Sequence, residues 1–355
     1  MLPGDSAPLR QLGPYRILRR LGAGGMAEVH LARRFGASGW EKAVAIKVLR
    51  AEHRGLAEFE RLLIAEAHLG ARFAHPGLVQ VHDLGLASGT YYVCMDYVDG
   101  GDLRALLRRR PLPRPLALYI GEQLALALAY VHRLGDDDGR PLGLVHRDVS
   151  PGNVLLSRSG AVKLSDFGIA KATAAADRTW GRLRKGKYAY MAPEQIIGAE
   201  LAGTADIFSL GITLHELLLG RHPFEPATSP SGAPCNDGPL ATMEAIRRAS
   251  LPADHDFADL SPRLTALLRR TLARDPNERL GSAALLAREL TKERRTLSAA
   301  GLLELSAWVR AAAGHPSEET ATAPALAEEP APETVGMDDS IADPTDPAAD
   351  LGRQE

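Results

Sequence analysis

Hydrophobic and polar positions alternate in short runs through the first hundred residues, a pattern typical of β-strands. Residues 15–34 predict two strands around a glycine turn, and AVAIKVL at 43–49, with its small and β-branched residues, predicts a third. Residues 75–98 predict two more strands, joined by a Ser-Gly turn. Residues 56–71 place apolar side chains every three or four positions, which predicts one helix. We therefore expect the first part of the chain to be mostly β.

The pattern changes after Gly100 and Gly101, where helical spacing dominates. Two short strand-like pieces, VLLS from 154 and AVKLS from 161, interrupt the helices. This second part is expected to be larger and mainly helical, so the chain is predicted to have an α+β fold with two lobes. The predicted helices span 102–109, 115–134, 205–220, 239–249, 261–273 and 282–311.

Three segments have compositions that do not favour a packed core. Residues 1–14 are rich in Pro and Gly and predict a flexible lead-in, while 225–239 predict a loop. Residues 315–355 are dominated by Pro, Ala, Glu and Asp, which predicts a disordered acidic tail. Residues 316–355 contain eleven Asp or Glu and one Arg, hence a charge of −10. The whole chain carries −2, so residues 1–315 carry +8.

Composition limits the class of protein and its partners. The 355 residues, of which 45% are hydrophobic and 24% charged, suffice for two domains or lobes. Two cysteines exclude a disulfide framework or clustered metal site and favour a cytoplasmic location. The N-terminus has no apolar secretory signal, and the longest apolar run, 116–131, is shorter than the roughly 20 residues that span a bilayer. The basic residues are dispersed, so we expect neither membrane nor nucleic acid as a partner.

The turn LGAGGMAEV at 21–29 and the lysine that follows it suggest a phosphate site. Gly22 and Gly24 would let backbone amides approach phosphate oxygens closely, although a plain hairpin turn has the same composition. A strand follows this turn, which excludes a dinucleotide-binding fingerprint. Lys47 lies within an apolar strand, where its charge requires an anion. Glu66, midway along the next helix, can supply a carboxylate, unless it belongs to the solvated face of that helix.

HRDVSPGN at 146–153 and SDFG at 165–168 add oxygen ligands at the ends of short strands. Asn153 and Asp166 together could hold a hard cation such as Mg²⁺. Asp148 could accept a proton from an alcohol. Each acidic residue alone could be a turn residue, but their joint spacing favours phosphoryl transfer.

With these motifs in order, the chain resembles the bacterial eukaryotic-like (Hanks-type) Ser/Thr protein kinases, and is similar to the soluble kinases of myxobacteria. The motifs are LGAGGMAEV, AIK, HRDVSPGN, DFG, APE, DIFSLG and DPNERL, and the resemblance covers residues 15 to about 290. It implies a bilobal protein-kinase fold with an antiparallel-sheet N-lobe at 15–96 and a mainly helical C-lobe at 97–290. A helical extension would occupy 291–314. The implied substrates are ATP and proteins, and the implied metal is Mg²⁺, with Mn²⁺ as an alternative.

The resemblance also implies roles for individual residues. Lys47 would hold the α- and β-phosphates with Glu66 as its partner, Asp148 would deprotonate the substrate hydroxyl, and Asn153 and Asp166 would bind the metal. Phe167 would pack against the helix that carries Glu66, Glu194 would pair with Arg279, and Asp206 would brace the catalytic loop. Arg147 would receive a phosphate on the activation loop, at Thr179 or Thr173. The implied nucleotide contacts are Leu21, Gly22, Ala23, Gly24, Gly25, Met26, Ala27, Glu28, Val29, Ala45, Lys47, Met95, Asp96, Val98, Asp102 and Leu155.

Three positions depart from the family pattern. Ala27 replaces the third glycine of the loop, and we expect a stiffer loop rather than an inactive one. Ser150 stands where the family has a lysine, and Lys187 stands where it has a threonine. We hypothesise that a hydroxyl and an ammonium group have exchanged positions, so that Ser150 and Lys187 both belong to the catalytic residues. Alternatively, Lys187 selects acidic substrate residues.

Other classes of function are also compatible with parts of the sequence. A pseudokinase scaffold is the main alternative, but all five residues of the expected catalytic set are present. A small-molecule kinase is disfavoured by the MAPE and DIFSLG motifs, and a tyrosine kinase by the family, although Ser150 weakens the second argument. Self-association for trans-autophosphorylation is compatible with the resemblance.

Overall fold

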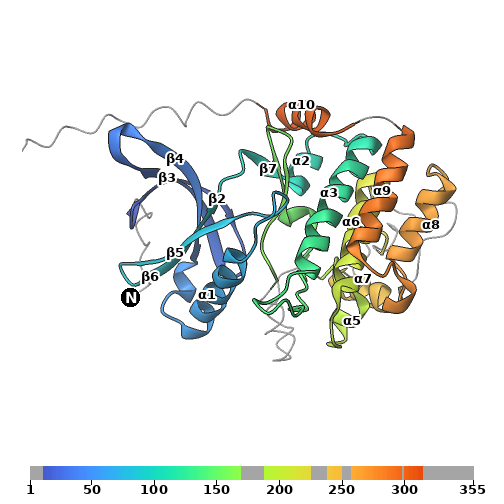
Figure 1. Cartoon of the computed structure of the whole chain (residues 1–355), viewed down its shortest axis with the longest axis horizontal. Coiled ribbons are helices and arrows are strands. Elements are labelled where there is room, and N and C mark those ends of the chain that lie inside the picture. The colour runs from blue at the N-terminus through green and yellow to red at the C-terminus, as the bar shows by residue number, and fades with distance from the viewer. Residues whose placement is uncertain (1–10, 169–187, 225–237, 250–256, 298–299, 315–355) are drawn as a thin grey trace, which may run out of the picture. The chain divides into compact units, whose positions relative to one another are not determined.

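The computed structural model describes residues 11–168, 188–224, 238–249, 257–297 and 300–314 (Figure 1). All of these residues fall within one compact unit, residues 1–315. An antiparallel sheet with one helix forms the N-lobe, and a helical assembly forms the C-lobe (Figure 1). The predicted α+β class and the bilobal arrangement are therefore confirmed.

The N-lobe sheet has six strands in the order β1-β2-β3-β4-β6-β5. Side chains alternate across β4, because successive residues of a strand point to opposite faces. Ile46 belongs to a core cluster on one face, which also contains Tyr15 and Tyr92. On the other face, α1 (Ala57–Ala71) packs Leu63 against Val93. The strands are β1 (Gln11–Leu12), β2 (Tyr15–Ala23), β3 (Ala27–Phe35), β4 (Glu41–Leu49), β5 (Val81–Ala87) and β6 (Thr90–Asp96).

Two features of this lobe depart in detail from the expectation. Strand β1 lies within the segment predicted as a flexible lead-in, and Leu12 is buried in the core because it pairs with Tyr15 of β2. The Ser-Gly turn joins β5 and β6 as predicted. Both its residues have positive φ, 48° at Ser88 and 72° at Gly89, as a tight two-residue hairpin requires.

The C-lobe is built around α6 (Gly203–Leu219), which is buried along nearly its whole length. Helix α3 (Arg114–His132) packs against α6 and α9 (Figure 1). Asp102 caps α2 by accepting a hydrogen bond from the amide of Ala105, and Ser261 caps α8 in the same way. The other helices described are α2 (Leu103–Leu107), α5 (Pro193–Ile196), α7 (Gly238–Arg248), α8 (Pro262–Thr271), α9 (Ala283–Leu297) and α10 (Leu302–Ala313).

A small sheet and several short helical turns connect these elements. The sheet has the order β7-β8-β9, from β7 (Gly100–Asp102), β8 (Val154–Ser157) and β9 (Val162–Leu164). Strand β7 falls at the glycine pair where the sequence pattern changes. The single-turn 3₁₀ helices described are η1 (Ala37–Gly39), η2 (Ala51–His53), η3 (Pro151–Asn153) and η6 (Pro276–Glu278).

The predicted helix over 282–311 is two helices, α9 and α10. Ala300 and Gly301 lie outside both helices, and Gly301 is the N-cap of α10. The side chain of Glu304 accepts a hydrogen bond from the amide of Gly301 at 2.8 Å, so α10 has its own start signal. Among the helices described, none has the length and apolar character needed to cross a membrane.

Candidate functional site

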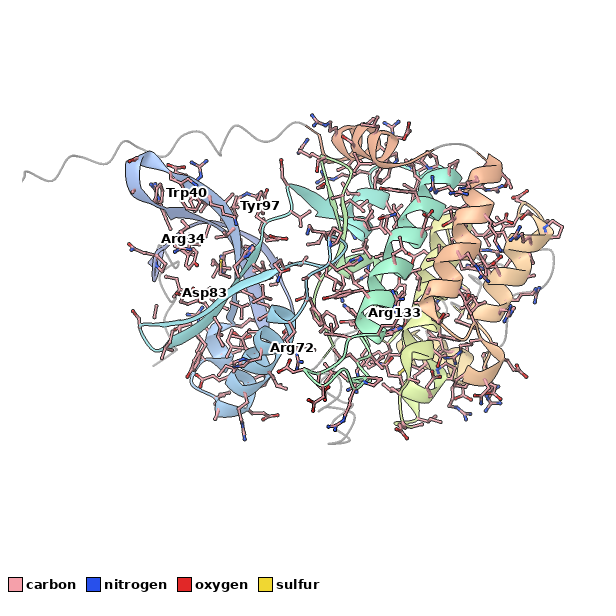
Figure 2. All side chains as sticks on the ribbon, viewed as in Figure 1. Arg34, Trp40, Arg72, Asp83, Tyr97 and Arg133 are labelled. Carbon is pink, nitrogen blue, oxygen red and sulfur yellow. The ribbon has the colours of Figure 1, made fainter. Side chains whose placement is uncertain are left out.

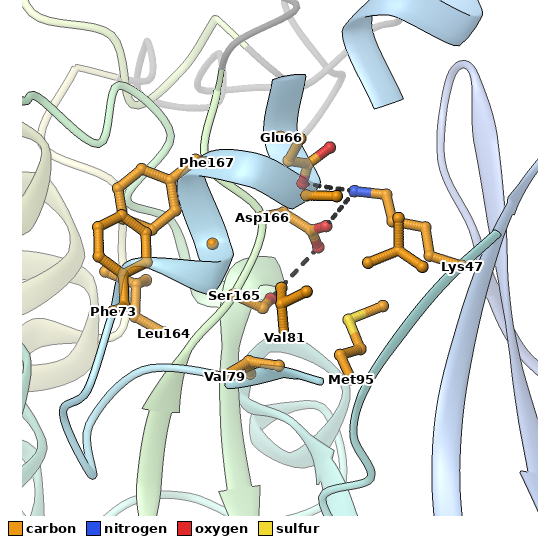
Figure 3. A pocket seen from close by; sticks show the side chains of 13 residues that line it. Lys47, Glu66, Phe73, Val79, Val81, Met95, Leu164, Ser165, Asp166 and Phe167 are labelled. Carbon is orange, nitrogen blue, oxygen red and sulfur yellow. Dashed lines mark hydrogen bonds and ion pairs between the residues drawn. The ribbon is translucent and has the colours of Figure 1, made fainter. Parts of the chain in front are cut away.

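Lys47 lies between two carboxylates in the cleft between the lobes (Figure 3). Its Nζ is 2.6 Å from Oε1 of Glu66 and 2.6 Å from Oδ1 of Asp166. Burial alone would lower the pKa of Lys47, but the two carboxylates outweigh burial and raise it. Lys47 therefore stays protonated across the physiological pH range.

Three separate elements bring these residues together. Lys47 is on β4, opposite Val29 of β3 and Val93 of β6. Glu66 is on α1, which covers this face of the sheet. Asp166 follows β9 and has a φ of +56°, a backbone conformation that is uncommon for a residue with a side chain. The contact with Lys47 accompanies this uncommon backbone conformation, so Asp166 is a constrained position.

Asp206 of α6 braces the loop at residues 146–153. Its fully buried carboxylate accepts hydrogen bonds from the amides of His146 (2.7 Å) and Arg147 (2.8 Å). It also lies 2.7 Å from Nε2 of His132 at the end of α3. Arg147 has a φ of +69°, so the loop is strained next to Asp148 and is stabilised by these charge-assisted bonds.

Asp148 and Asn153 are connected through the backbone of the same loop. Nδ2 of Asn153 donates to the carbonyl of Asp148 at 2.8 Å, which leaves the Asn153 side-chain oxygen available to a ligand. The carbonyl of Asn153 accepts the amide of Ser165 at 2.9 Å, and Oγ of Ser165 donates to Oδ2 of Asp166 at 3.3 Å. Asp148, Asn153 and Asp166 are thus held in one hydrogen-bonded unit.

The donor set of this unit fits a magnesium ion. Mg²⁺ usually takes one or two protein oxygens and completes its shell with water and phosphate oxygens. Asn153 supplies an amide oxygen and Asp166 a carboxylate. Across the residues that the structure describes, no cluster of three or more His, Cys, Asp or Glu side chains offers an all-protein metal cage. A bound nucleotide would have to contribute to the metal shell.

Phe167 sits in an aromatic stack between the lobes. Its ring centroid is 4.4 Å from that of Phe73 and 4.3 Å from that of His146. Phe73 lies two residues beyond the C-terminal end of α1, so Phe167 stacks on the segment that directly follows the helix carrying Glu66. Next to this stack is a cavity of about 40 Å³ lined by Lys47 and Met95 (Figure 3). The stack links the position of α1 to the conformation of the segment at Asp166.

The glycine turn joins β2 and β3, and its backbone closes on itself. The amide of Gly24 donates to the carbonyl of Ala27 at 2.7 Å. A Cβ at Gly22 or Gly25 would meet nothing within 4 Å, so the space beside the turn is open to a ligand. Ala27 is the first residue of β3, and its methyl is buried opposite Leu49. This methyl therefore packs into the lobe rather than into the open space.

The chain crosses between the lobes after β6, near Tyr97 (Figure 2). The carboxylate of Asp96 lies 3.0 Å from Nζ of Lys163 and 2.9 Å from Nε2 of His82. Burial opposes ionisation of Asp96, but these partners and a backbone amide hold its pKa below the usual value. The next residues, Tyr97 and Val98, belong to no strand, and Val98 makes no backbone hydrogen bond within the described residues. The backbone of Val98 is thus available to a ligand, whereas the Asp96 side chain is not.

The remaining predicted nucleotide contacts occupy the two sides of this cleft. Ala45 pairs with Met95 across β4 and β6, and Leu155 on β8 pairs with Asp102 on β7. One carboxylate oxygen of Asp102 is engaged in the cap of α2. The other predicted contacts, Leu21, Ala23, Met26, Glu28 and Val29, lie on β2, β3 or the turn between them.

The predicted activation segment falls largely outside the described residues. Thr173, Thr179 and Lys187 are among the residues that the structure leaves undescribed, so the proposed exchange with Ser150 is untested. Ser150 is buried, and its hydroxyl has no hydrogen-bond partner within the described ranges. Downstream, the predicted pair of Glu194 and Arg279 is present, with Nη1 2.6 Å from Oε1.

Sequence reasoning missed several residues that support the site. His132 contacts Asp206 although 74 positions separate them. Phe73 stacks on Phe167, and Lys163 binds Asp96. His132 directly follows a long apolar helical run, which is the one local signal that could have indicated it. The other contacts depend on how the two lobes meet, and no local pattern indicates them.

Comparison with known proteins agrees with this geometry. Residues 15–291 match the protein kinase domain family. The chain is 38% identical over 321 residues to the tyrosine-protein kinase MasK of Myxococcus xanthus, covering 88% of this chain and 48% of that protein. It is also 38% identical over 214 residues to the serine/threonine-protein kinase PrkC of Bacillus subtilis, covering 60% of this chain and 31% of PrkC. The chain thus spans about half or less of the length of these two relatives.

Among solved structures, the chain is similar to the kinase domain of PknI from Mycobacterium tuberculosis. The crystal structure of a double mutant of that domain superimposes with a TM-score of 0.59 at 30% sequence identity. The match covers 82% of this chain and 100% of that domain.

Proposed function

Because the chain belongs to the protein kinase family, we propose that it transfers the γ-phosphate of ATP to serine and threonine hydroxyls of proteins. The observation that carries this proposal is the Lys47 ammonium between the carboxylates of Glu66 and Asp166. A pseudokinase scaffold has no need to keep a buried cation poised at the site of the phosphates. The predicted location in the cytoplasm and the absence of nucleic-acid and membrane partners remain part of this proposal.

Positioning and charge neutralisation provide most of the catalysis in phosphoryl transfer. Lys47 would bind the α- and β-phosphates, with Glu66 fixing the direction of its side chain. Asn153 and Asp166 would hold Mg²⁺, which supplies positive charge at the phosphates when bound. The backbone of Val98 would hydrogen-bond the adenine.

Asp148 is the residue we assign to proton transfer. Its backbone is fixed by Asn153 and by the neighbouring contacts of Asp206. A carboxylate held there can orient a substrate hydroxyl and accept its proton as the bond to phosphorus forms. Thr179 or Thr173 would receive an activating phosphate, which Arg147 would bind.

Tyrosine as the acceptor is the second candidate. Two observations favour it: MasK carries the name of a tyrosine-protein kinase, and Ser150 replaces the lysine typical of Ser/Thr kinases. Acid hydrolysis of the labelled protein releases phosphoserine, phosphothreonine and phosphotyrosine, which thin-layer electrophoresis then separates. Phosphotyrosine as the main product would overturn the Ser/Thr assignment while retaining the kinase one.

The decisive experiment measures ³²P incorporation from Mg²⁺-ATP into the protein itself and into a generic basic protein substrate. We expect incorporation by the wild type, loss with EDTA, and loss in Asp148→Asn. The matched control is Asp138→Asn, an exposed aspartate on the loop before the catalytic loop. Direct ATP binding by the wild type without incorporation would support the pseudokinase alternative instead.

A further inference from the structure

Helix α10 begins beyond residue 291, where the match to the kinase family ends, yet it is an integral part of the C-lobe. Its inner face is apolar, because Leu305, Trp308, Val309 and Ala312 recur at helical spacing and join the main core cluster. Nε1 of Trp308 donates to the carbonyl of Pro111, in the connection between α2 and α3, at 2.9 Å. In Figure 1, α10 lies beside β7 and α2.

Contacts with α9 and α3 fix the position at which α10 begins. Arg294 of α9 donates through Nε to the buried Glu122 of α3 at 2.7 Å. The same guanidinium donates through Nη1 to the carbonyl of Ala300 at 2.7 Å, one residue before the N-cap. The path of the chain into α10 is therefore set by a largely buried ion pair.

The other side of α10 rests on the turn between β8 and β9. The carbonyl of Arg158 accepts hydrogen bonds from Oγ of Ser306 at 2.7 Å and from Nε of Arg310 at 3.1 Å. Nη2 of Arg158 donates to the carbonyl of Gly314, just after the end of α10, at 2.8 Å. Gly160 has a φ of +88°, and a Cβ there would lie 2.1 Å from the carbonyl oxygen of Leu302. The turn and the helix therefore fit with no space for a side chain at Gly160.

Arg158 also contacts the segment that follows the crossing between the lobes. Its amide donates to the carbonyl of Asp99 at 2.6 Å. Its Nε lies 3.5 Å from Oδ1 of Asp99, a distance at which the attraction is mainly electrostatic. Asp99 directly follows Val98, and β7 begins at the next residue. A single arginine thus connects α10 to the backbone that would bind adenine.

Strands β7, β8 and β9 are three or four residues long, too short to be stable without a layer behind them. Strand β7 also contains Gly100 and Gly101, which increase its freedom in the absence of support. The same strands carry Asp102 and Leu155, both predicted to contact the nucleotide. Helix α10 backs the strands from which these side chains project.

From these contacts we infer that α10, acting through Arg158, is a positioning element for nucleotide binding. It fixes the segment from Val98 to Asp102 before ATP arrives, so that binding does not have to order this segment. The inference rests on the proposed kinase function. It assigns to residues outside the family match a role in ATP affinity.

The test compares Arg158→Ala with Arg114→Ala in the full chain. Arg114 is the control, because its guanidinium also binds a backbone carbonyl and a carboxylate, both of Asp259, which lies outside the β8–β9 turn and the segment from Val98 to Asp102. Arg158→Ala removes the side-chain contacts with Gly314 and Asp99 and keeps the backbone hydrogen bonds of residue 158. We expect it to raise the KM and Kd for ATP severalfold, with little change in kcat at saturating ATP. Arg114→Ala should change neither constant.

A second variant separates positioning from general stability. Ser306→Ala with Arg310→Ala removes both donors to the Arg158 carbonyl but leaves the buried face of α10 intact. It should raise the KM for ATP in the same direction, by less than Arg158→Ala, with no change in the KM for the protein substrate. Unchanged ATP affinity in both variants would overturn the inference. Failure of the wild type to bind ATP would overturn the proposed function instead.

Discussion

Glu194 and Arg279, 85 positions apart, form a buried ion pair with two parallel hydrogen bonds of 2.6 and 2.8 Å. The guanidinium also donates to the carbonyls of Ala273, Thr204 and Arg274, and lies over the ring of Phe208 at 4.8 Å. All its interactions use the planar, forked geometry that only arginine has. The pair joins the APE segment to the turn before α9.

Replacement of Arg279 should destabilise the fold strongly. Arg279→Ala leaves the buried Glu194 carboxylate without its partner, and we expect a loss of about 3–5 kcal/mol of unfolding free energy. Arg279→Lys should recover part of that loss, since one ammonium cannot satisfy both carboxylate oxygens and the three carbonyls. Urea unfolding measures both. The control is Arg248→Lys, whose partner Glu244 is on the surface, and wild-type stability in Arg279→Lys would contradict this account.

Removal of the Glu66 charge should affect catalysis more than folding. Glu66→Gln keeps the shape of the side chain but weakens its hold on Lys47, which would then be drawn toward Asp166 alone. We expect kcat/KM for ATP to fall about 100-fold, as for other small misplacements of catalytic groups. Steady-state kinetics with Glu58→Gln, an exposed position on the same helix, provide the comparison. Equal kinetics in the two variants would show that Glu66 has no positioning role.

The exchange of hydroxyl and ammonium groups between positions 150 and 187 predicts a specific pattern of mutant activities. Lys187→Ala and Lys187→Thr should both lose most activity, since neither supplies an ammonium to Asp148 and the γ-phosphate. The double variant Lys187→Thr with Ser150→Lys should regain it, because the pair then matches the usual family arrangement. Kinase assays of the three variants decide the question. Full activity of Lys187→Ala would eliminate the hypothesis.

A pH-dependent loss of stability should arise from His222. Burial lowers its pKa to about 4, only partly offset by the 2.7 Å contact of Nε2 with the carbonyl of Ala189. The unfolded chain binds this proton near pH 6.5 and the folded chain does not, so stability decreases as the pH falls from about 6.5 to 4. The contribution at pH 4 is on the order of 3 kcal/mol.

Urea unfolding from pH 7 to 4 tests this prediction. His222→Gln should show a shallower dependence on pH than the wild type, because glutamine has no proton to gain in this range. His68→Gln, at an exposed position on α1, should keep the wild-type slope. Identical slopes in all three proteins would rule out His222 as the source.

Local patterns in the sequence predicted most helices and strands of the fold. Helices and strands bury apolar side chains at different spacings, so the sequence distinguishes the two. The small and β-branched residues around Lys47 predicted β4, and Ser88 with Gly89 predicted the hairpin between β5 and β6. The break between α9 and α10 was missed because apolar residues continue through it. Gly301 was the available signal, since it caps α10 in a region where the periodicity alone indicates one helix.

Site residues that belong to sequence motifs could be predicted. Contacts that depend on how distant elements pack together could not. The pairing of Lys47 with Glu66 was expected from the AIK motif and the helix that follows it, and the DFG motif indicated Asp166 as a site residue, but the contact of Asp166 with Lys47 was not predicted. The contact of Arg158 with Asp99 has no motif. It depends on the fit of α10 against the turn at Gly160, which only the assembled lobe determines.

The lack of a side chain at Gly160 also helps to recognise other kinases that have a helix placed like α10. Any kinase that continues into a helix placed like α10 needs a glycine at the β8–β9 turn, because even a methyl would meet the backbone of Leu302. The φ of +88° at Gly160 favours glycine at this turn even without such a helix, so the glycine alone does not identify one. A glycine at this turn, paired with a tryptophan about 150 residues downstream as at Trp308, is therefore a searchable signature for kinases whose catalytic unit extends past the usual domain boundary.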